Sequence, residues 1–119
     1  MNFHPYTQMI NNDSMTPTIQ PNDKLIYTDP KPPFKDGLYL ISYPFNHRGV
    51  THTITQPMRL IFKESSVIMM HDNPTYEAST EELQGKELNS VTLIGKIVTN
   101  LTAIERAKRL RAWREERGL

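Results

Sequence analysis

The feature that most constrains the fold of this chain is the length and spacing of its apolar runs. Short apolar or alternating runs recur about every ten to fifteen residues, with turn-forming residues between them. Runs of this length are typical of β-strands, whereas an amphipathic helix shows a longer pattern with a period of about 3.6 residues. The chain is therefore predicted to be mainly β, with strands at residues 6–10, 24–28, 37–43, 50–54, 58–62, 67–70 and 91–98.

Turn chemistry separates the predicted strands. Residues 29–33 contain three prolines, which cannot continue a strand ladder because proline has no backbone N–H. Residues 46–49 suit a hairpin loop, so the runs on either side are expected to pair. The polar residues 79–82 are expected to open a single helical turn, because Ser79 and Glu82 have the spacing of a capping box.

The C-terminal part of the chain has a helical pattern instead. Residues 101–117 are predicted to form an α-helix, with Asn100 or Thr102 as N-cap and Glu105 completing a capping box. Apolar residues at helical spacing favour packing of this helix on its own domain over contact with nucleic acid. This apolar face comprises Ala103, Ile104, Ala107, Leu110 and Trp113. The predicted organisation is a β domain at residues 1–99 with a basic amphipathic helix at residues 100–119 packed on it.

Charge is divided unevenly between these two parts. The helical region carries six basic against three acidic residues, a local charge of +3. The whole chain of 119 residues carries +1, so the remainder carries −2, the difference between +1 and +3. The whole-chain charge argues neither for nor against a nucleic-acid partner.

Composition excludes several classes of function. The chain has no cysteine, which excludes disulfides, thiolate zinc sites and cysteine nucleophiles. Its four histidines, His4, His47, His52 and His71, lack metal-ligand spacing, so neither a metal nor another cofactor is expected. No apolar run approaches the roughly 20 residues of a membrane span, and the N-terminus lacks a signal-peptide layout. We therefore expect a soluble, cytoplasmic single domain.

A serine in a tight turn is the strongest candidate for chemistry. The segment Asp13-Ser14-Met15-Thr16-Pro17 lies between the first two predicted strands. A serine hydroxyl becomes a nucleophile at neutral pH only when a base activates it, and a lysine serves only when burial lowers its pKa. The same segment is also compatible with a purely structural turn that an Asx-type hydrogen bond holds.

The serine turn resembles the nucleophile turn of LexA-like repressors, phage repressor C-terminal domains and UmuD-like accessory subunits, which reads Gly-Asp-Ser-Met-x-Pro-x-Ile. Asn12 stands where that family commonly has glycine. Further motifs follow in the order that the family has: Asp36-Gly37-Leu38-Tyr39, Met58-Arg59-Leu60, Asp72-Asn73-Pro74-Thr75-Tyr76 and Ile94-Gly95-Lys96-Ile97-Val98. The resemblance covers roughly residues 8–98. It implies LexA/signal-peptidase-like coiled antiparallel sheets, partly barrel-like, followed here by one C-terminal α-helix.

In this family a lysine that directly precedes Arg-Leu or Lys-Leu activates the serine, and the pair cleaves the protein's own linker. By that motif the lysine position in this chain is Met58, whose thioether does not accept a proton. Three other residues could act as the base, Lys63, His52 and Lys24. Lys63 is expected to be solvated at a strand end, His52 to lie in a hairpin arm before the strand, and Lys24 to be exposed on the next strand. The predicted site is therefore a vestigial nucleophile, Ser14, with Met58 at the place of the missing base.

Two further elements of the family are missing upstream of the serine. Only thirteen residues precede Ser14, and they hold neither an Ala-Gly or Cys-Gly cleavage bond nor a helix-turn-helix domain. The chain is therefore expected to be a fragment or a stand-alone version of the C-terminal domain.

The resemblance favours a non-catalytic role in the self-association of a transcriptional regulator of the phage-repressor or SOS-response type. The implied partners are a second copy in a homodimer, DNA through a separate or missing helix-turn-helix domain, and a recombinase filament or an antirepressor. Two alternatives stay open. One is an active Ser-Lys-type self-processing peptidase with a displaced base, and the other is a UmuD-like polymerase accessory subunit.

Overall fold

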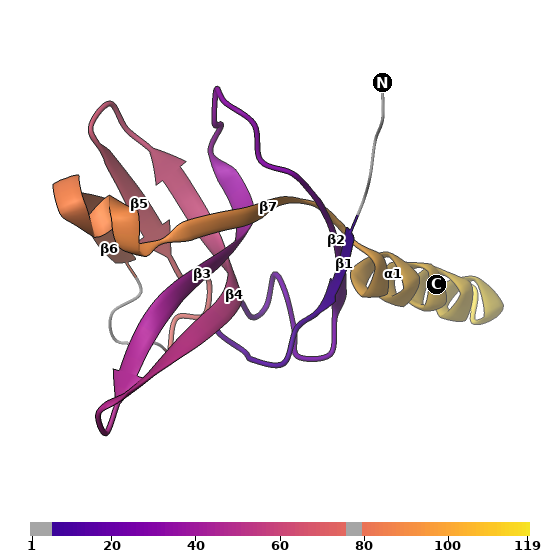
Figure 1. Ribbon diagram of the computed structural model, residues 1–119. Coiled ribbons are helices and arrows are strands. Elements are labelled where there is room, and N and C mark those ends of the chain that lie inside the picture. The colour runs from indigo at the N-terminus through magenta and orange to yellow at the C-terminus, as the bar shows by residue number, and fades with distance from the viewer. Residues whose placement is uncertain (1–5, 76–79) are drawn as a thin grey trace.

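The computed structural model describes residues 6–75 and 80–119 of the chain. In this part, seven antiparallel strands form one sheet and one α-helix follows them, which confirms the mainly β prediction (Figure 1). The elements are β1 (Tyr6–Met9), β2 (Lys24–Thr28), β3 (Gly37–His47), β4 (Val50–Phe62), β5 (Ser66–Met70), β6 (Thr80–Gln84), the 3₁₀ helix η1 (Gly85–Ser90), β7 (Thr92–Asn100) and α1 (Leu101–Glu116).

The order of the strands leaves the sheet open. Across the sheet the order is β1-β2-β7-β3-β4-β5-β6, so β1 and β6 are edges and the described strands do not close into a barrel. The antiparallel part of the prediction is thus confirmed, and the described strands form one open sheet. The last strand along the chain, β7, lies between β2 and β3 and pairs antiparallel with both.

The β3–β4 hairpin is the longest ladder of the sheet and runs further than predicted. Arg48 and Gly49 form its two-residue turn with φ angles of 52° and 77°, as a type I′ turn requires. Two separately predicted strands merge into β4 through Pro57. At Pro57, β4 has a paired strand, β3, on one side only, because its pairing with β5 begins at Arg59. A proline is tolerated at such a position, since it need not donate a hydrogen bond toward the unpaired side.

The predicted helical turn at residues 79–82 is wrong. Ser79 lies outside the described residues, and Thr80 to Glu82 belong to the edge strand β6, which pairs with β5. Pairing with a neighbouring strand overrides the local capping pattern, since strand formation depends strongly on the surrounding sheet. A helical turn does occur directly afterwards, as η1.

Two buried apolar clusters lie against the sheet. Alternate residues of a strand point to opposite faces, which explains why Tyr39 and Ile41 belong to one cluster and Leu40 to the other. The sheet core consists of Tyr39, Ile41, Met58, Leu60, Met69 and Leu83. The turn core consists of Ile10, Met15, Ile19, Leu25 and Leu40, and it holds the loop between β1 and β2.

Gly95 in β7 has a packing reason. A Cβ at this position would lie 2.1 Å from Cδ2 of Tyr27, so the ring occupies the space that any side chain would need. The Tyr27 ring in turn stacks on Tyr6, with a distance of 5.3 Å between the ring centroids. The glycine of the Ile94-Gly95-Lys96 motif is therefore required by the approach of β2 and β7.

Polar contacts fix the start of α1 to the sheet. The Asn100 side-chain oxygen accepts a hydrogen bond from the backbone N–H of Ala103 at 3.0 Å, which identifies Asn100 as the N-cap. The Thr102 hydroxyl oxygen accepts a hydrogen bond from the backbone N–H of Lys24 at 2.9 Å. Because the N-cap is the last residue of β7 and the Thr102 hydroxyl is bound to the first residue of β2, the helix begins where these two strands meet.

A buried carboxylate completes this junction. Asp23 is 1% exposed, and its two oxygens accept hydrogen bonds from the Arg106 guanidinium at 2.5 and 3.2 Å and from Asn100 Nδ2 at 2.8 Å. Burial by itself raises the pKa of Asp23. Hydrogen bonds from Arg106, Asn100 and the backbone N–H of Gln20 outweigh burial and lower this pKa from 3.8 to about 2. The charged form of Asp23 thus joins α1 to the loop that precedes β2.

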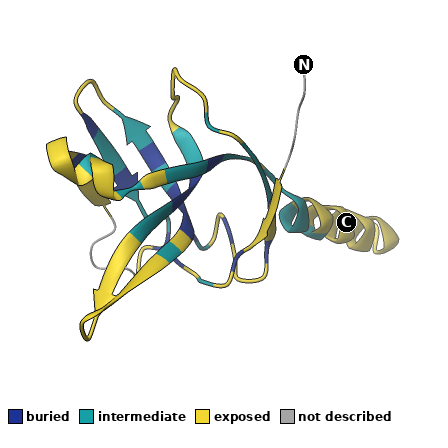
Figure 2. Cartoon of the chain, viewed as in Figure 1, coloured by how far each residue is buried: buried dark blue, intermediate teal, exposed yellow. Residues whose placement is uncertain are grey.

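Beyond these contacts α1 projects past the sheet, and none of its side chains is buried (Figure 2). Leu110 and Trp113 are 50% and 45% exposed. The predicted packing of the apolar face is therefore wrong beyond Ala103, which is half-buried, since Ile104, Ala107, Leu110 and Trp113 are all exposed. Among the described residues, no helix is long and apolar enough to cross a membrane.

Trp113→Ala is accordingly expected to change the free energy of unfolding by no more than about 0.5 kcal/mol, as substitutions at exposed positions usually do. In the structure its ring contacts the Arg117 guanidinium, at 4.2 Å from the ring centroid, on the same exposed helix. Thermal unfolding at low protein concentration measures the effect. A loss of about 3 kcal/mol, as for a large core truncation, would mean that the helix packs on the domain after all.

Candidate functional site

The serine turn is held in one conformation by its own backbone and by two buried anchors. The backbone N–H of Thr16 donates to the carbonyl of Asp13 at 3.1 Å, and that of Ile19 donates to the carbonyl of Met15 at 2.9 Å. Met15 and Ile19 are 0% and 2% exposed and belong to the turn core. The buried Met15 and Ile19 therefore anchor the turn directly after Ser14.

The Ser14 hydroxyl points at an amide oxygen. It donates a hydrogen bond to Oδ1 of Asn12 at 3.0 Å, and the backbone N–H of Ser14 donates to the same oxygen at 3.3 Å. Because the backbone N–H only donates, the oxygen rather than the nitrogen of the Asn12 amide must face Ser14. An amide oxygen does not take a proton at neutral pH, so this partner does not activate the hydroxyl.

Access to the hydroxyl is also restricted, since Ser14 is only 2% exposed. A nucleophile must come within about 3 to 3.5 Å of the carbon that it attacks. A substrate carbonyl therefore reaches Ser14 only if the turn moves. In the arrangement observed, the hydroxyl acts as a structural group that holds the Asn12–Ser14 turn.

A second segment, residues 72–75, contacts the serine turn through Asn73. Asn73 Nδ2 donates to the carbonyl of Asp13 at 2.8 Å, and its backbone N–H donates to the carbonyl of Ser14 at 3.0 Å. The Asn73 Oδ1 accepts from the backbone N–H and the hydroxyl of Thr75 at 3.0 and 2.8 Å. Asn73 is 7% exposed, and these hydrogen bonds, which we call the Asn73 bridge, satisfy its buried polar groups.

Asp72 links the same segment to β4. Its carboxylate accepts two hydrogen bonds from Arg59 at 2.8 and 2.9 Å and one from the Thr18 hydroxyl at 2.5 Å. The bonds from Arg59, aided by Thr18, outweigh burial and lower the pKa of the Asp72 carboxyl below its usual value. Arg59 thus connects β4, the segment at residues 72–75 and the serine turn.

Met58, the residue at the place of the family's lysine, is 1% exposed and lies in the sheet core. It pairs across the β3–β4 ladder with Tyr39 and packs in the same cluster as Ile41 and Leu60. The buried anchors of the serine turn belong instead to the turn core. The two predicted site residues are therefore both buried, but they belong to different parts of the structure's interior.

The three residues that could replace the lysine as the base lie away from the serine turn in sequence or on the surface. Lys63 forms an ion pair with Glu82, with 3.8 Å between the Nζ and carboxylate atoms. His52 lies in the exposed arm of the β3–β4 hairpin. Lys24 is exposed at the start of β2. These placements agree with the expectation that each side chain is solvated or on another strand.

Two features of this region were not found from the sequence. The sequence identifies the Asp72-Asn73 motif, but it does not predict the contacts of these side chains with the serine turn. The last residue of that motif, Tyr76, lies outside the described residues. The junction of Asp23 with Arg106 was missed entirely, because the two residues are 83 positions apart and no local pattern pairs them.

The chemistry that these residues support is limited. Within residues 6–75 and 80–119, no three His, Cys, Asp or Glu side chains gather in a way that could hold a metal ion. Comparison of the chain with protein-family models, with curated proteins and with solved structures found no match. The functional interpretation therefore depends on the site geometry and on the sequence motifs.

Proposed function

We propose that this chain is a repressor-type C-terminal domain that acts in the self-association of a transcriptional regulator, with a vestigial serine nucleophile turn. The observation that carries this proposal is the hydrogen bond from the buried Ser14 hydroxyl to the amide oxygen of Asn12. A working Ser-Lys pair would require a basic nitrogen in the place of that oxygen.

The ordered motifs and the fold class support the family part of the proposal. The serine turn and the Asp72-Asn73 motif, far apart in sequence, are joined by the Asn73 bridge. The Met58-Arg59-Leu60 motif reaches the same region through the ion pair of Arg59 with Asp72. We infer from these contacts that the single open sheet is a LexA-like sheet, in which Arg59 and the Asp72-Asn73 motif lie beside the serine turn.

Loss of catalysis has two independent causes in this proposal. Met58 stands at the family's lysine position in the sequence, and its thioether does not accept a proton. Its side chain lies in the sheet core, whereas the anchors of the serine turn lie in the turn core, so no base comes from this position. Asn12, in place of the family's glycine, supplies a hydrogen-bond acceptor that holds the Ser14 hydroxyl. Loss of a general base typically lowers a rate by a factor of about 10² to 10⁴, and loss of nucleophile activation adds to it. The function that we propose for the domain is therefore self-association.

The catalytic part of the proposal is tested with a peptide that contains an Ala-Gly bond. The unmodified protein is expected to leave the peptide intact at neutral and alkaline pH, and Ser14→Ala is expected to behave in the same way. The double variant Asn12→Gly/Met58→Lys restores both family residues and is expected to cleave the peptide at neutral as well as alkaline pH, because burial lowers the pKa of a lysine at position 58.

Two results would contradict this proposal. Cleavage by the unmodified protein that Ser14→Ala abolishes would mean that an unidentified base activates Ser14, and the self-processing peptidase would then be the correct function. A folded double variant that does not cleave the peptide would show that Met58 does not occupy the base position.

A further inference from the structure

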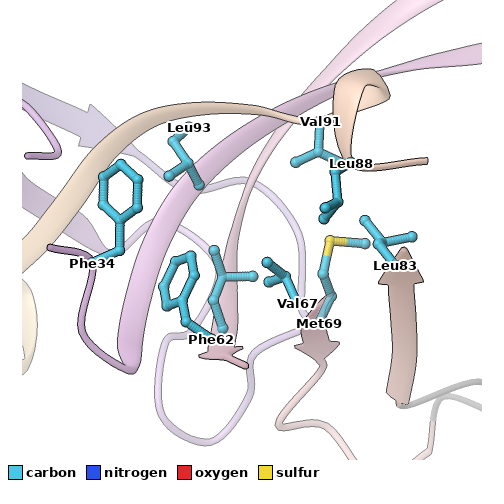
Figure 3. A pocket seen from close by; sticks show the side chains of 9 residues that line it. Phe34, Phe62, Val67, Met69, Leu83, Leu88, Val91 and Leu93 are labelled. Carbon is cyan, nitrogen blue, oxygen red and sulfur yellow. The ribbon is translucent and has the colours of Figure 1, made fainter. Parts of the chain in front are cut away.

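An apolar pocket of about 280 Å³ opens beside the sheet core, on the face formed by β4, β5, β6, η1 and β7 (Figure 3). Its lining, as far as the described residues go, contains only apolar side chains. They include Phe34, Phe62, Met69, Leu83, Leu88 and Val91, which point toward a common centre in the close view. Nothing in this lining would orient a polar small molecule, so the pocket suits an apolar side chain.

The walls of this pocket remain partly in contact with solvent. Phe34 is 39% exposed, and Leu88 and Val91 are only half-buried at the margin of the sheet core. These side chains would leave water if an apolar side chain of another molecule entered the pocket, and that transfer is favourable. The pocket is therefore suited to an apolar side chain of another molecule.

The helix α1 exposes the complementary kind of surface. Leu110 and Trp113 are adjacent on one side of the helix and are 50% and 45% exposed. The two surfaces lie at opposite ends of the molecule, because α1 contacts β2 near one edge of the sheet whereas the pocket includes β6, the other edge (Figure 1). The helix of one copy therefore does not reach its own pocket, but it is free to enter the pocket of a second copy.

Charge favours this pairing. Residues 80–90, which contribute Leu83 and Leu88 to the pocket, carry three glutamates and one lysine, a net charge of −2. The helical region carries +3, and because Arg106 is paired with Asp23 its other residues, five basic and three acidic, carry +2. Opposite charges on two surfaces steer them together and discourage the pairing of like surfaces. Two copies of α1 packed against each other would instead bring +2 against +2.

We propose that Trp113 and Leu110 of α1 dock into the apolar pocket of a second copy of this chain. The inference deepens the proposed function, on which it rests, because it names the contact through which self-association occurs. A pair in which each helix enters the other copy's pocket satisfies both pockets and forms a closed two-fold dimer.

The basic helix is a less suitable surface for nucleic acid. Arg106 is bound to Asp23, and Arg117 lies over the Trp113 ring. Contact with a phosphate backbone would leave Leu110 and Trp113 without apolar partners. Binding of α1 to DNA in place of a second copy would therefore contradict the proposed docking.

The single tryptophan of the chain makes the docking directly observable. As the protein concentration rises through the micromolar range, the emission maximum of Trp113 is expected to move to shorter wavelength, since the indole leaves water. Sedimentation of the same samples reports the mass. Leu88→Glu, which places a charge at the pocket margin, is expected to abolish the spectral shift and to weaken association about tenfold or more. The matched control is Val50→Glu, at a position that is 56% exposed on the β3–β4 hairpin.

Disulfide trapping identifies the contact, because the natural chain has no cysteine. Mixing the Arg109→Cys and Leu88→Cys proteins under mild oxidation is expected to give a cross-linked heterodimer, because position 109 lies beside Leu110 and Trp113 and both docking side chains are kept. Lys108→Cys, on another side of α1, is the control in place of Arg109→Cys and is expected to give little product. Cross-linking of Arg109→Cys to itself at least as fast would mean that helices pair with helices, and the proposed docking would be wrong.

The outcomes separate this inference from the proposed function. If the protein sediments as a dimer while the Trp113 emission stays unchanged, the docking is wrong but self-association stands. If the protein is monomeric throughout, both are wrong. A spectral shift that appears only when a DNA duplex is added, and that vanishes at high salt, would identify α1 as a nucleic-acid contact and would also overturn the docking.

Discussion

Met58→Lys is expected to lower the free energy of unfolding by about 4 kcal/mol or more at pH 7. Met58 is 1% exposed among apolar side chains, and burial of an ammonium group lowers its pKa by up to about 3 to 5 units. Each unit corresponds to about 1.4 kcal/mol. Denaturant unfolding measures the loss.

The pH dependence of this variant has a defined sign. A lysine whose folded-state pKa is depressed binds its proton more readily in the unfolded state, so stability rises with pH. The loss is largest below the depressed folded pKa and diminishes as the pH approaches the unfolded value of about 10.4. Met58→Leu keeps the volume, is expected to cost less than about 1.5 kcal/mol and should add no such slope. A variant with Lys at position 58 that is as stable as the Leu control at pH 7 would show that this position is solvated.

Arg106→Met is expected to destabilise the protein by about 3 kcal/mol at pH 7, because it leaves the buried Asp23 carboxylate without its cationic partner. In the natural protein the pKa of Asp23 is depressed from 3.8 to about 2. Its charged form therefore stabilises the fold fully above the unfolded pKa, and this contribution is lost as the pH falls through about 2. The difference between the two proteins should accordingly shrink as the pH falls from about 4 to about 2.

The matched control for this prediction is Arg109→Met on the same helix. The Arg109 side chain is 80% exposed and lies 3.9 Å from the Glu105 carboxylate, an exposed pair one helical turn apart. Such pairs are worth about 0.3 to 0.5 kcal/mol. Equal effects of the two substitutions would mean that the Asp23 junction contributes nothing specific to the attachment of α1.

The strands were predictable from the sequence because each apolar run has its own local signal. The runs at β1, β2, β5 and β7 needed no knowledge of their partners. The errors occur where pairing decides instead. β4 continues through Pro57 because that position has a neighbouring strand on one side only, and β6 forms because β5 offers it an edge.

The helix α1 and its N-cap were also predictable, but its surroundings were not. The apolar spacing of Leu110 and Trp113 indicates a buried face, and the same spacing serves equally for a surface that meets another molecule. Only the placement of α1 at the edge of the sheet, which Asp23 and Arg106 fix across 83 positions, distinguishes the two.

At the serine turn, the motif located the turn itself and the residue types that stand in it. The partner of the Ser14 hydroxyl was not evident, since a free asparagine side chain offers both an acceptor and two donors. The backbone N–H of Ser14 decides which atom of Asn12 faces the hydroxyl. That geometry, rather than the absence of a lysine alone, explains why the serine is proposed to be inert.

The central claim is that this chain acts by associating with itself. Sedimentation equilibrium of the unmodified protein across the micromolar range measures this directly. We expect a mass that rises with concentration toward twice the 13.8 kDa of one chain. A mass that stays at 13.8 kDa at every concentration would contradict it.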